Sequence, residues 1–181
     1  MGRIIFLAGP FAYVVKSKHS GESGGSVAAD EIERGKTVKV TVVGSKFFGA
    51  SVLAALQKEP GVAISGVVAP AADDRLALAA QKAGIPVHVQ PNPKIVEGEA
   101  ILPGTDVIIA AHTHARVSNE ALARARLGGV GYHPSLLPRH RGIAAVEWTI
   151  LSGDPIAGGS VYHLADGWDK GGIALQDWCF V

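Results

Sequence analysis

Short apolar runs alternate with segments of helical hydrophobic spacing along most of the chain. Runs rich in β-branched residues predict strands at 38–43, 62–68, 87–89, 107–111, 130–133, 159–164 and 173–180. Helical spacing of apolar residues predicts helices at 47–57, 75–83, 119–125 and 144–151. Strands that alternate with helices of this length indicate an α/β fold, with a doubly wound, mostly parallel, Rossmann-like sheet and helices on both faces.

The N-terminal part of the chain has a different pattern. Two short apolar runs, 4–8 and 12–16, flank a Gly-Pro pair and predict two strands around a turn. Residues 20–36 are rich in glycine, serine and charge, which is typical of a connection. We therefore divide the chain into an N-terminal extension, 1–36, and one catalytic domain, 37–181.

A secretory signal peptide is the alternative for the first residues, because their apolar run follows Arg3 and Ser26-Val27-Ala28 would suit cleavage. Against this, Lys16, Lys18 and His19 lie between the run and the cleavage site. The Gly-Pro pair would also break a helix there. The run is too short to span a bilayer, so we prefer the two strands.

Composition narrows the function classes. The length of 181 residues suits one domain, and 48% hydrophobic with 18% charged residues argues against disorder. A net charge of +1 offers no broad field for a polyanion, so we expect a small-molecule ligand and no nucleic acid. The single cysteine, Cys179, excludes an internal disulfide and fits a reducing compartment. We expect a cytoplasmic protein without a membrane partner.

Ligands of doubly wound sheets bind beyond the carboxyl ends of the strands, which directs attention to the loops near Gly44, His112, His133 and Asp166. Residues 44–49 follow a strand and open a helix, where an anion would meet free backbone N–H groups. They lack the GxGxxG and Walker patterns, so a plain strand-to-helix turn is the preferred interpretation.

His112 and His114 follow the strand at 107–111 and would share a face if the segment stayed extended. Such a pair is compatible with a metal site, but no third ligand is close in sequence. We prefer polar residues at a pocket mouth, or a solvated loop, and expect no bound metal.

Two loops carry the candidate chemistry. His133 follows a predicted strand in a loop stiffened by Pro134 and Pro138. A second loop, 166–172, places Asp169 amid glycines between two predicted strands. A histidine and an aspartate on neighbouring strand ends are the minimum for acid-base catalysis.

These loops also carry a resemblance. The run His133-Pro134-Ser135-Leu136-Leu137-Pro138, followed by Arg141-Gly142, residues 148–154 and a Gly-x-Asp-x-Gly at 167–171, resembles the formyltetrahydrofolate-using family. That family includes methionyl-tRNA formyltransferase, glycinamide ribonucleotide formyltransferase, sugar N-formyltransferases and the hydrolase domain of 10-formyltetrahydrofolate dehydrogenase. Residues 132–142 look most like the last. The resemblance begins near Lys39 and is specific from Tyr132 onward.

The resemblance implies a reactive triad of asparagine, histidine and aspartate, in which His133 and Asp169 match the last two. At the place of the asparagine, two residues before the histidine, this chain has Gly131. The dehydrogenase-type hydrolase domain has an aliphatic residue there, so the departure does not imply an inactive enzyme, but it removes an amide that helps to hold the formyl oxygen. Ser135 is expected to position the carboxylate of Asp169 by hydrogen bonding.

The resemblance also implies that the pterin of N10-formyltetrahydrofolate is held by strand-end loops. The residues expected to bind it are Ala110, Ala111, His112, Leu164, Ala165, Asp166 and Gly167. The segment 112–117 departs from the hydrophobic loop expected in the family, which puts the shape of the pocket in question.

The function implied is hydrolysis of N10-formyltetrahydrofolate to tetrahydrofolate and formate, or transfer of its formyl group to a small amine. A folate-binding module with weak or no turnover is the alternative, motivated by Gly131 and the altered loop at 112–117. Because the sequence ends at Val181, soon after its last predicted strand, we expect no transfer-RNA contact. The acceptor is then water, a small amine or a group on a partner chain, and a homo-oligomer stays open.

Overall fold

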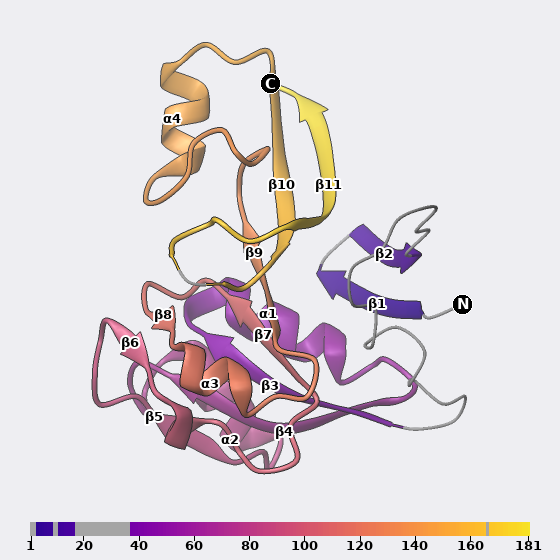
Figure 1. Ribbon diagram of the computed structural model, residues 1–181, viewed down its shortest axis with the longest axis vertical. Coiled ribbons are helices and arrows are strands. Elements are labelled where there is room, and N and C mark those ends of the chain that lie inside the picture. The colour runs from indigo at the N-terminus through magenta and orange to yellow at the C-terminus, as the bar shows by residue number, and fades with distance from the viewer. Residues whose placement is uncertain (1–2, 9–10, 17–36, 166) are drawn as a thin grey trace, which may run out of the picture.

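The computed structural model describes residues 3–8, 11–16, 37–165 and 167–181 of the chain. Its elements (Figure 1) are β1 (Arg3–Ala8), β2 (Phe11–Lys16), β3 (Val38–Gly44), α1 (Lys46–Leu56), β4 (Val62–Ala69), α2 (Arg75–Lys82), β5 (Val87–Val89), β6 (Ile95–Val96), the 3-10 helix η1 (Gly98–Ala100), β7 (Val107–Ala111), β8 (Arg116–Val117), α3 (Asn119–Ala123), β9 (Gly129–His133), α4 (Ala145–Leu151), β10 (Ile156–His163) and β11 (Ile173–Phe180).

The main sheet confirms the predicted α/β fold. Its seven strands lie in the order β11-β10-β9-β7-β3-β4-β5. The five strands from β9 to β5 are parallel, whereas β10 and β11 run antiparallel at one edge. The chain builds outward from β3 through β4 to β5, then returns to place β7 on the other side of β3. The strand order therefore reverses between β3 and β7, where a doubly wound sheet forms its ligand crevice.

Helices cover both faces of the parallel strands, as predicted. On one face Val40, Val42 and Ile109 pack with the buried side chains of α1 and α2. On the other face Val43 and Ile108 pack against η1 and α3. Successive strand residues alternate between these two clusters because side chains point to opposite faces of a strand. The continuous apolar runs seen in the sequence follow from burial on both faces.

The antiparallel edge differs most from the sequence prediction. The β10–β11 hairpin and α4 project beyond the parallel strands in Figure 1, and β10 begins at Ile156, three residues before the predicted start at 159. The missed residues include Gly158, a residue type depleted in strands. Its lack of a side chain is required, since an added Cβ would lie 2.4 Å from the carbonyl oxygen of Asp177. The short parallel pair of β6 and β8 was not predicted either.

The N-terminal strands agree with the prediction in kind: β1 pairs antiparallel with β2. The intervening Gly9-Pro10, and the connection at 20–36, lie outside the described residues. Within the part of the chain that the structure describes, no helix is long and apolar enough to cross a membrane.

Candidate active site

His133 and Asp169 meet at the end of the sheet. His133 is the last residue of β9, and Asp169 lies in the loop between β10 and β11. The distance from His133 Nδ1 to Asp169 Oδ2 is 3.5 Å, and the two side chains are only 8% and 6% exposed. Both line a cavity of about 700 Å³, a size suited to a small organic ligand.

A larger cavity of about 810 Å³ lies beside this one. Its walls are mostly apolar, with side chains such as Phe48, Val146 and Trp178. No histidine is among its lining residues, and neither His133 nor Asp169 reaches it. The smaller cavity is therefore the one that both candidate residues line.

Both ring nitrogens of His133 face acceptors. Nε2 lies 2.8 Å from the carbonyl oxygen of His140, and because a carbonyl only accepts, Nε2 must donate there. Nδ1 faces the Asp169 carboxylate at 3.5 Å, somewhat beyond the usual hydrogen-bond range. Both nitrogens of the ring are thus engaged by protein groups.

Asp169 joins its loop to the one that follows His133. Its Oδ2, which faces the imidazole, also accepts a hydrogen bond of 2.8 Å from the backbone N–H of Gly142. The backbone of Asp169 is left-handed, with φ of 50°, a conformation that aspartate tolerates better than most residues. One carboxylate thus orients the ring and fixes the end of the loop at 134–142.

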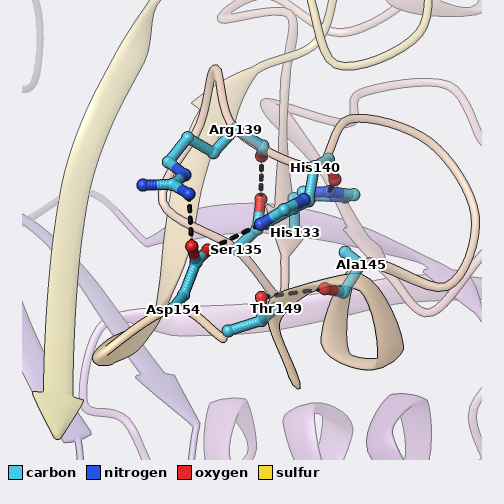
Figure 2. A network of polar contacts seen from close by, with 7 residues as sticks. All are labelled: His133, Ser135, Arg139, His140, Ala145, Thr149 and Asp154. Carbon is cyan, nitrogen blue, oxygen red and sulfur yellow. Dashed lines mark hydrogen bonds and ion pairs between the residues drawn. The ribbon is translucent and has the colours of Figure 1, made fainter. Parts of the chain in front are cut away.

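A polar network holds this loop from behind (Figure 2). The buried Asp154 lies 2.7 Å from His140 Nε2 through its Oδ2 and contacts the guanidinium of Arg139 through its Oδ1. These contacts position the backbone of His140, whose carbonyl faces His133. Arg139, His140 and Asp154 were not predicted as site residues, although all three lie inside the segments that carried the resemblance.

The predicted hydrogen bond from Ser135 to the carboxylate of Asp169 is not formed, and this prediction is corrected. The hydroxyl of Ser135 donates to the carbonyl oxygen of Arg139 at 2.6 Å (Figure 2) and not to Asp169. Its own carbonyl accepts from the hydroxyl of Ser160 at 2.6 Å. Ser135 therefore closes the tight turn between Pro134 and Arg139, where a serine side chain competes well for backbone groups.

The place of the missing asparagine is occupied by other side chains. Gly131 of β9 is the cross-strand partner of Tyr162 in β10. A Cβ on Gly131 would lie 3.0 Å from Leu164 Cδ2 and 3.1 Å from both Cε1 and Cζ of Tyr162. Burial, and then a hydrogen bond to the Asp169 carboxylate, raises the pKa of Tyr162. Sequence reasoning missed Tyr162, because strand register is not visible in a single sequence.

Most residues expected to bind the folate line the smaller cavity: Ala110, His112, Leu164, Ala165 and Gly167. Ala111 lines the adjoining larger cavity instead; it is 1% exposed, and its carbonyl accepts from the N–H of Ser45 at 3.3 Å. A role of Ala111 in folate binding stays a prediction. Asp166 lies outside the described residues.

The rim of the cavity carries His112, His114 and Lys46, which agrees with the pocket-mouth interpretation. The ring centroids of the two histidines are 5.2 Å apart in an edge-on arrangement. Desolvation, followed by the charges of His114 and Lys46, lowers the pKa of His112. Among the described residues there is no group of three or more side chains suited to holding a metal.

The turn after β3 is a plain connection, as preferred. The backbone N–H of Lys46, at the start of α1, donates to both carboxylate oxygens of Asp74 at 3.1 Å. An added Cβ on Gly44 would lie 2.0 Å from the carbonyl oxygen of Ala111, so the close approach of β3 and β7 requires glycine here.

The chain is similar to known proteins over most of its length. Residues 36–181 match the family described as formyl transferase. Human cytosolic 10-formyltetrahydrofolate dehydrogenase is 34% identical over 155 residues, which cover 80% of this chain and 17% of that protein. The structure of phosphoribosylglycinamide formyltransferase from Anaplasma phagocytophilum is 27% identical, with a TM-score of 0.66 over 81% of this chain and 74% of its own.

A formyltetrahydrofolate deformylase from Pseudomonas syringae pv. tomato shares the fold, with a TM-score of 0.68 and 20% identity over 81% of this chain and 52% of its own. The chain spans only a small part of the curated dehydrogenase, so similarity to that protein concerns one segment of it. Because the family match runs from residue 36 to residue 181 and contains both loops of the site, the chain belongs to the formyl transferase family.

Proposed function

We propose that this chain uses N10-formyltetrahydrofolate as formyl donor, with His133 and Asp169 as its reactive pair. The observation that carries the proposal is their position, 3.5 Å apart and buried, in the wall of a ligand-sized cavity. Family membership supports the choice of a folate, since relatives named for formyltetrahydrofolate chemistry match most of this chain.

The chemistry required is attack on a formyl carbon. Water, or an amine, adds to that carbon and gives a tetrahedral intermediate whose oxygen is negative. The His133 imidazolium supplies positive charge beside it, and Asp169 accepts the proton that the attacking group loses. The bond from carbon to N10 then breaks, N10 takes up the proton held by Asp169, and tetrahydrofolate leaves with formate or the formylated amine as the second product.

Water is the acceptor we favour. The motif at 132–142 resembles the hydrolase domain of 10-formyltetrahydrofolate dehydrogenase, and the human cytosolic form of that protein is 34% identical to this chain over 155 residues. The test is to incubate the protein with N10-formyltetrahydrofolate without any amine and to quantify tetrahydrofolate and formate. Equal amounts of both, in excess over protein, support hydrolysis. Turnover that appears only after addition of a small amine would assign transfer instead.

A folate-binding module without turnover is the second candidate. It is favoured by Gly131 and by the engagement of both His133 nitrogens with protein acceptors. Titration calorimetry with N10-formyltetrahydrofolate, followed by product analysis of the same sample, separates the two. Binding without any tetrahydrofolate formed would support the module, and catalytic turnover would eliminate it.

The remaining partners follow from the same proposal. We propose a small-molecule folate and water or a small amine as the ligands, without nucleic acid. A cytoplasmic location stays a prediction, since similar relatives include both a cytosolic and a mitochondrial dehydrogenase. The boundary near residue 36 between an extension and the catalytic domain is likewise a proposal, and the family match beginning at residue 36 is compatible with it.

A further inference from the structure

The proposed reaction needs a hydrogen-bond donor aimed at the formyl oxygen as it becomes negative. His133 is the obvious candidate, but its Nε2 proton is held by the carbonyl oxygen of His140 at 2.8 Å. Its Nδ1 faces Asp169 at 3.5 Å. Neither ring nitrogen is directed at a ligand in this arrangement. A second donor is therefore required.

The register of β9 and β10 places the phenol of Tyr162 near His133. In the antiparallel pair of β9 and β10, His133 lies opposite Ser160 and Gly131 lies opposite Tyr162. Directly opposed residues share a face of the sheet, and so do residues two apart on one strand. Tyr162 is therefore on the same face as His133, one pleat along, and its ring lies over the bare Cα of Gly131. Tyr162, Gly131, His133 and Asp169 all line the same cavity.

Gly131 is what makes room for the phenol. A Cβ at this position would lie 3.1 Å from Tyr162 Cζ, the atom that carries the hydroxyl, which is tighter than ordinary van der Waals contact. Any larger side chain on β9 would displace the ring from the cavity wall. The absence of a polar side chain at residue 131 and the presence of a hydroxyl opposite it are thus two parts of one packing arrangement.

We propose that the Tyr162 hydroxyl is a catalytic hydrogen-bond donor to the formyl oxygen of the bound substrate. This inference rests on the proposed function. The hydroxyl rests against Asp169, the group that takes the proton from the attacking water. Once Asp169 is protonated it is a weaker acceptor, and the O–H rotates toward the oxygen that has just become negative. Tyr162 keeps its own proton throughout and forms no covalent bond.

The protonation state of the phenol agrees with this role. Burial, and the hydrogen bond to Asp169, raise the pKa of Tyr162 above its ordinary value of 10.0, so the hydroxyl is neutral at any physiological pH. A neutral phenol in a partly buried site is a donor that needs no reorganisation of solvent when charge develops.

The test is Tyr162→Phe, which removes the hydroxyl and keeps the ring over Gly131. We expect kcat to fall about a hundred- to a thousandfold, the usual cost of one oxyanion donor, with the Kd for N10-formyltetrahydrofolate changed less than about threefold. The control is Thr41→Val, which likewise removes one hydroxyl. Thr41 is buried in β3, lines neither cavity and hydrogen-bonds the hydroxyl of Thr105, so its variant should keep the wild-type kcat.

Two results would overturn the inference. One is a kcat for Tyr162→Phe equal to that of the wild type. The other is a parallel loss of kcat, folate affinity and melting temperature, which would mean that the hydroxyl serves packing alone. A wild-type protein without turnover would instead contradict the proposed function, so the two failures are distinguishable.

Discussion

Asp169 Oδ2 faces His133 Nδ1 at 3.5 Å and at the same time accepts the backbone N–H of Gly142 at 2.8 Å. One oxygen therefore orients the imidazole and anchors the loop that supplies the carbonyl to the other side of the same ring. The two loops that carry the family motif are thus mechanically joined at this carboxylate.

Replacing the Asp169 carboxylate by an amide tests its role as a proton acceptor while keeping the size of the side chain. In Asp169→Asn the amide oxygen can still accept from Gly142, so the fold should be kept, but the side chain can no longer take a proton. We expect kcat to fall about a hundred- to ten-thousandfold. The exposed Asp73 provides the matched control, since Asp73→Asn removes a charge outside both cavities. Comparable kcat values for both variants would contradict the role of Asp169.

The packing of Gly131 predicts a stability effect. Gly131→Ala places a methyl group 3.0 to 3.1 Å from Leu164 and Tyr162, so we expect the free energy of unfolding to fall by about 1–3 kcal/mol. Urea denaturation measures this change. Gly172→Ala is the control, because a Cβ on Gly172 meets nothing within 4 Å. An unchanged denaturation midpoint for Gly131→Ala would show that Tyr162 is not packed against this residue.

The network behind the loop predicts a contrast between buried and exposed ion pairs. Asp154→Ala leaves His140 and Arg139 without their common acceptor, and we expect a loss of about 1–3 kcal/mol in unfolding free energy. Glu120→Ala removes an exposed i,i+4 pair with Arg124, worth at most about 0.5 kcal/mol. Thermal denaturation of both variants checks the difference, and equal losses would refute it.

His112 predicts a pH dependence of stability. Its pKa is lowered mainly by desolvation, so below about its ordinary value of 6.5 the unfolded chain binds more protons than the folded one. The free energy of unfolding should therefore decrease as pH falls from 7.5 to 5.5. His112→Asn removes this titration and suits the left-handed backbone, with φ of 58°. Its stability should decline less over that range; parallel curves would contradict the assignment.

Sequence predicted the parallel part of the fold well, for a physical reason. Strands buried on both faces, such as β3 and β7, give short apolar runs rich in β-branched residues, and their length favours a strand over a helix. The start of β10 was missed because Gly158 carries no strand signal, although close packing requires a glycine there. An added Cβ on Gly158 would lie 2.4 Å from the carbonyl oxygen of Asp177.

The site was predictable only in part. His133 and Asp169 could be found because their motif is local and long. The true partner of Ser135, and the position of Tyr162 opposite Gly131, depend on loop closure and strand register. Those relations join residues that are distant in sequence, and a single chain without its fold does not display them.

The central claim is that the paired imidazole and carboxylate make this chain a formyltetrahydrofolate-using enzyme. It is tested most directly by the rate of tetrahydrofolate release from N10-formyltetrahydrofolate for the wild type, for His133→Ala and for His163→Ala, which alters an exposed histidine of β10. We expect turnover by the wild type and by His163→Ala, and at least a hundredfold loss, about the minimum for a general acid-base group, in His133→Ala. Equal rates for all three proteins would contradict the claim.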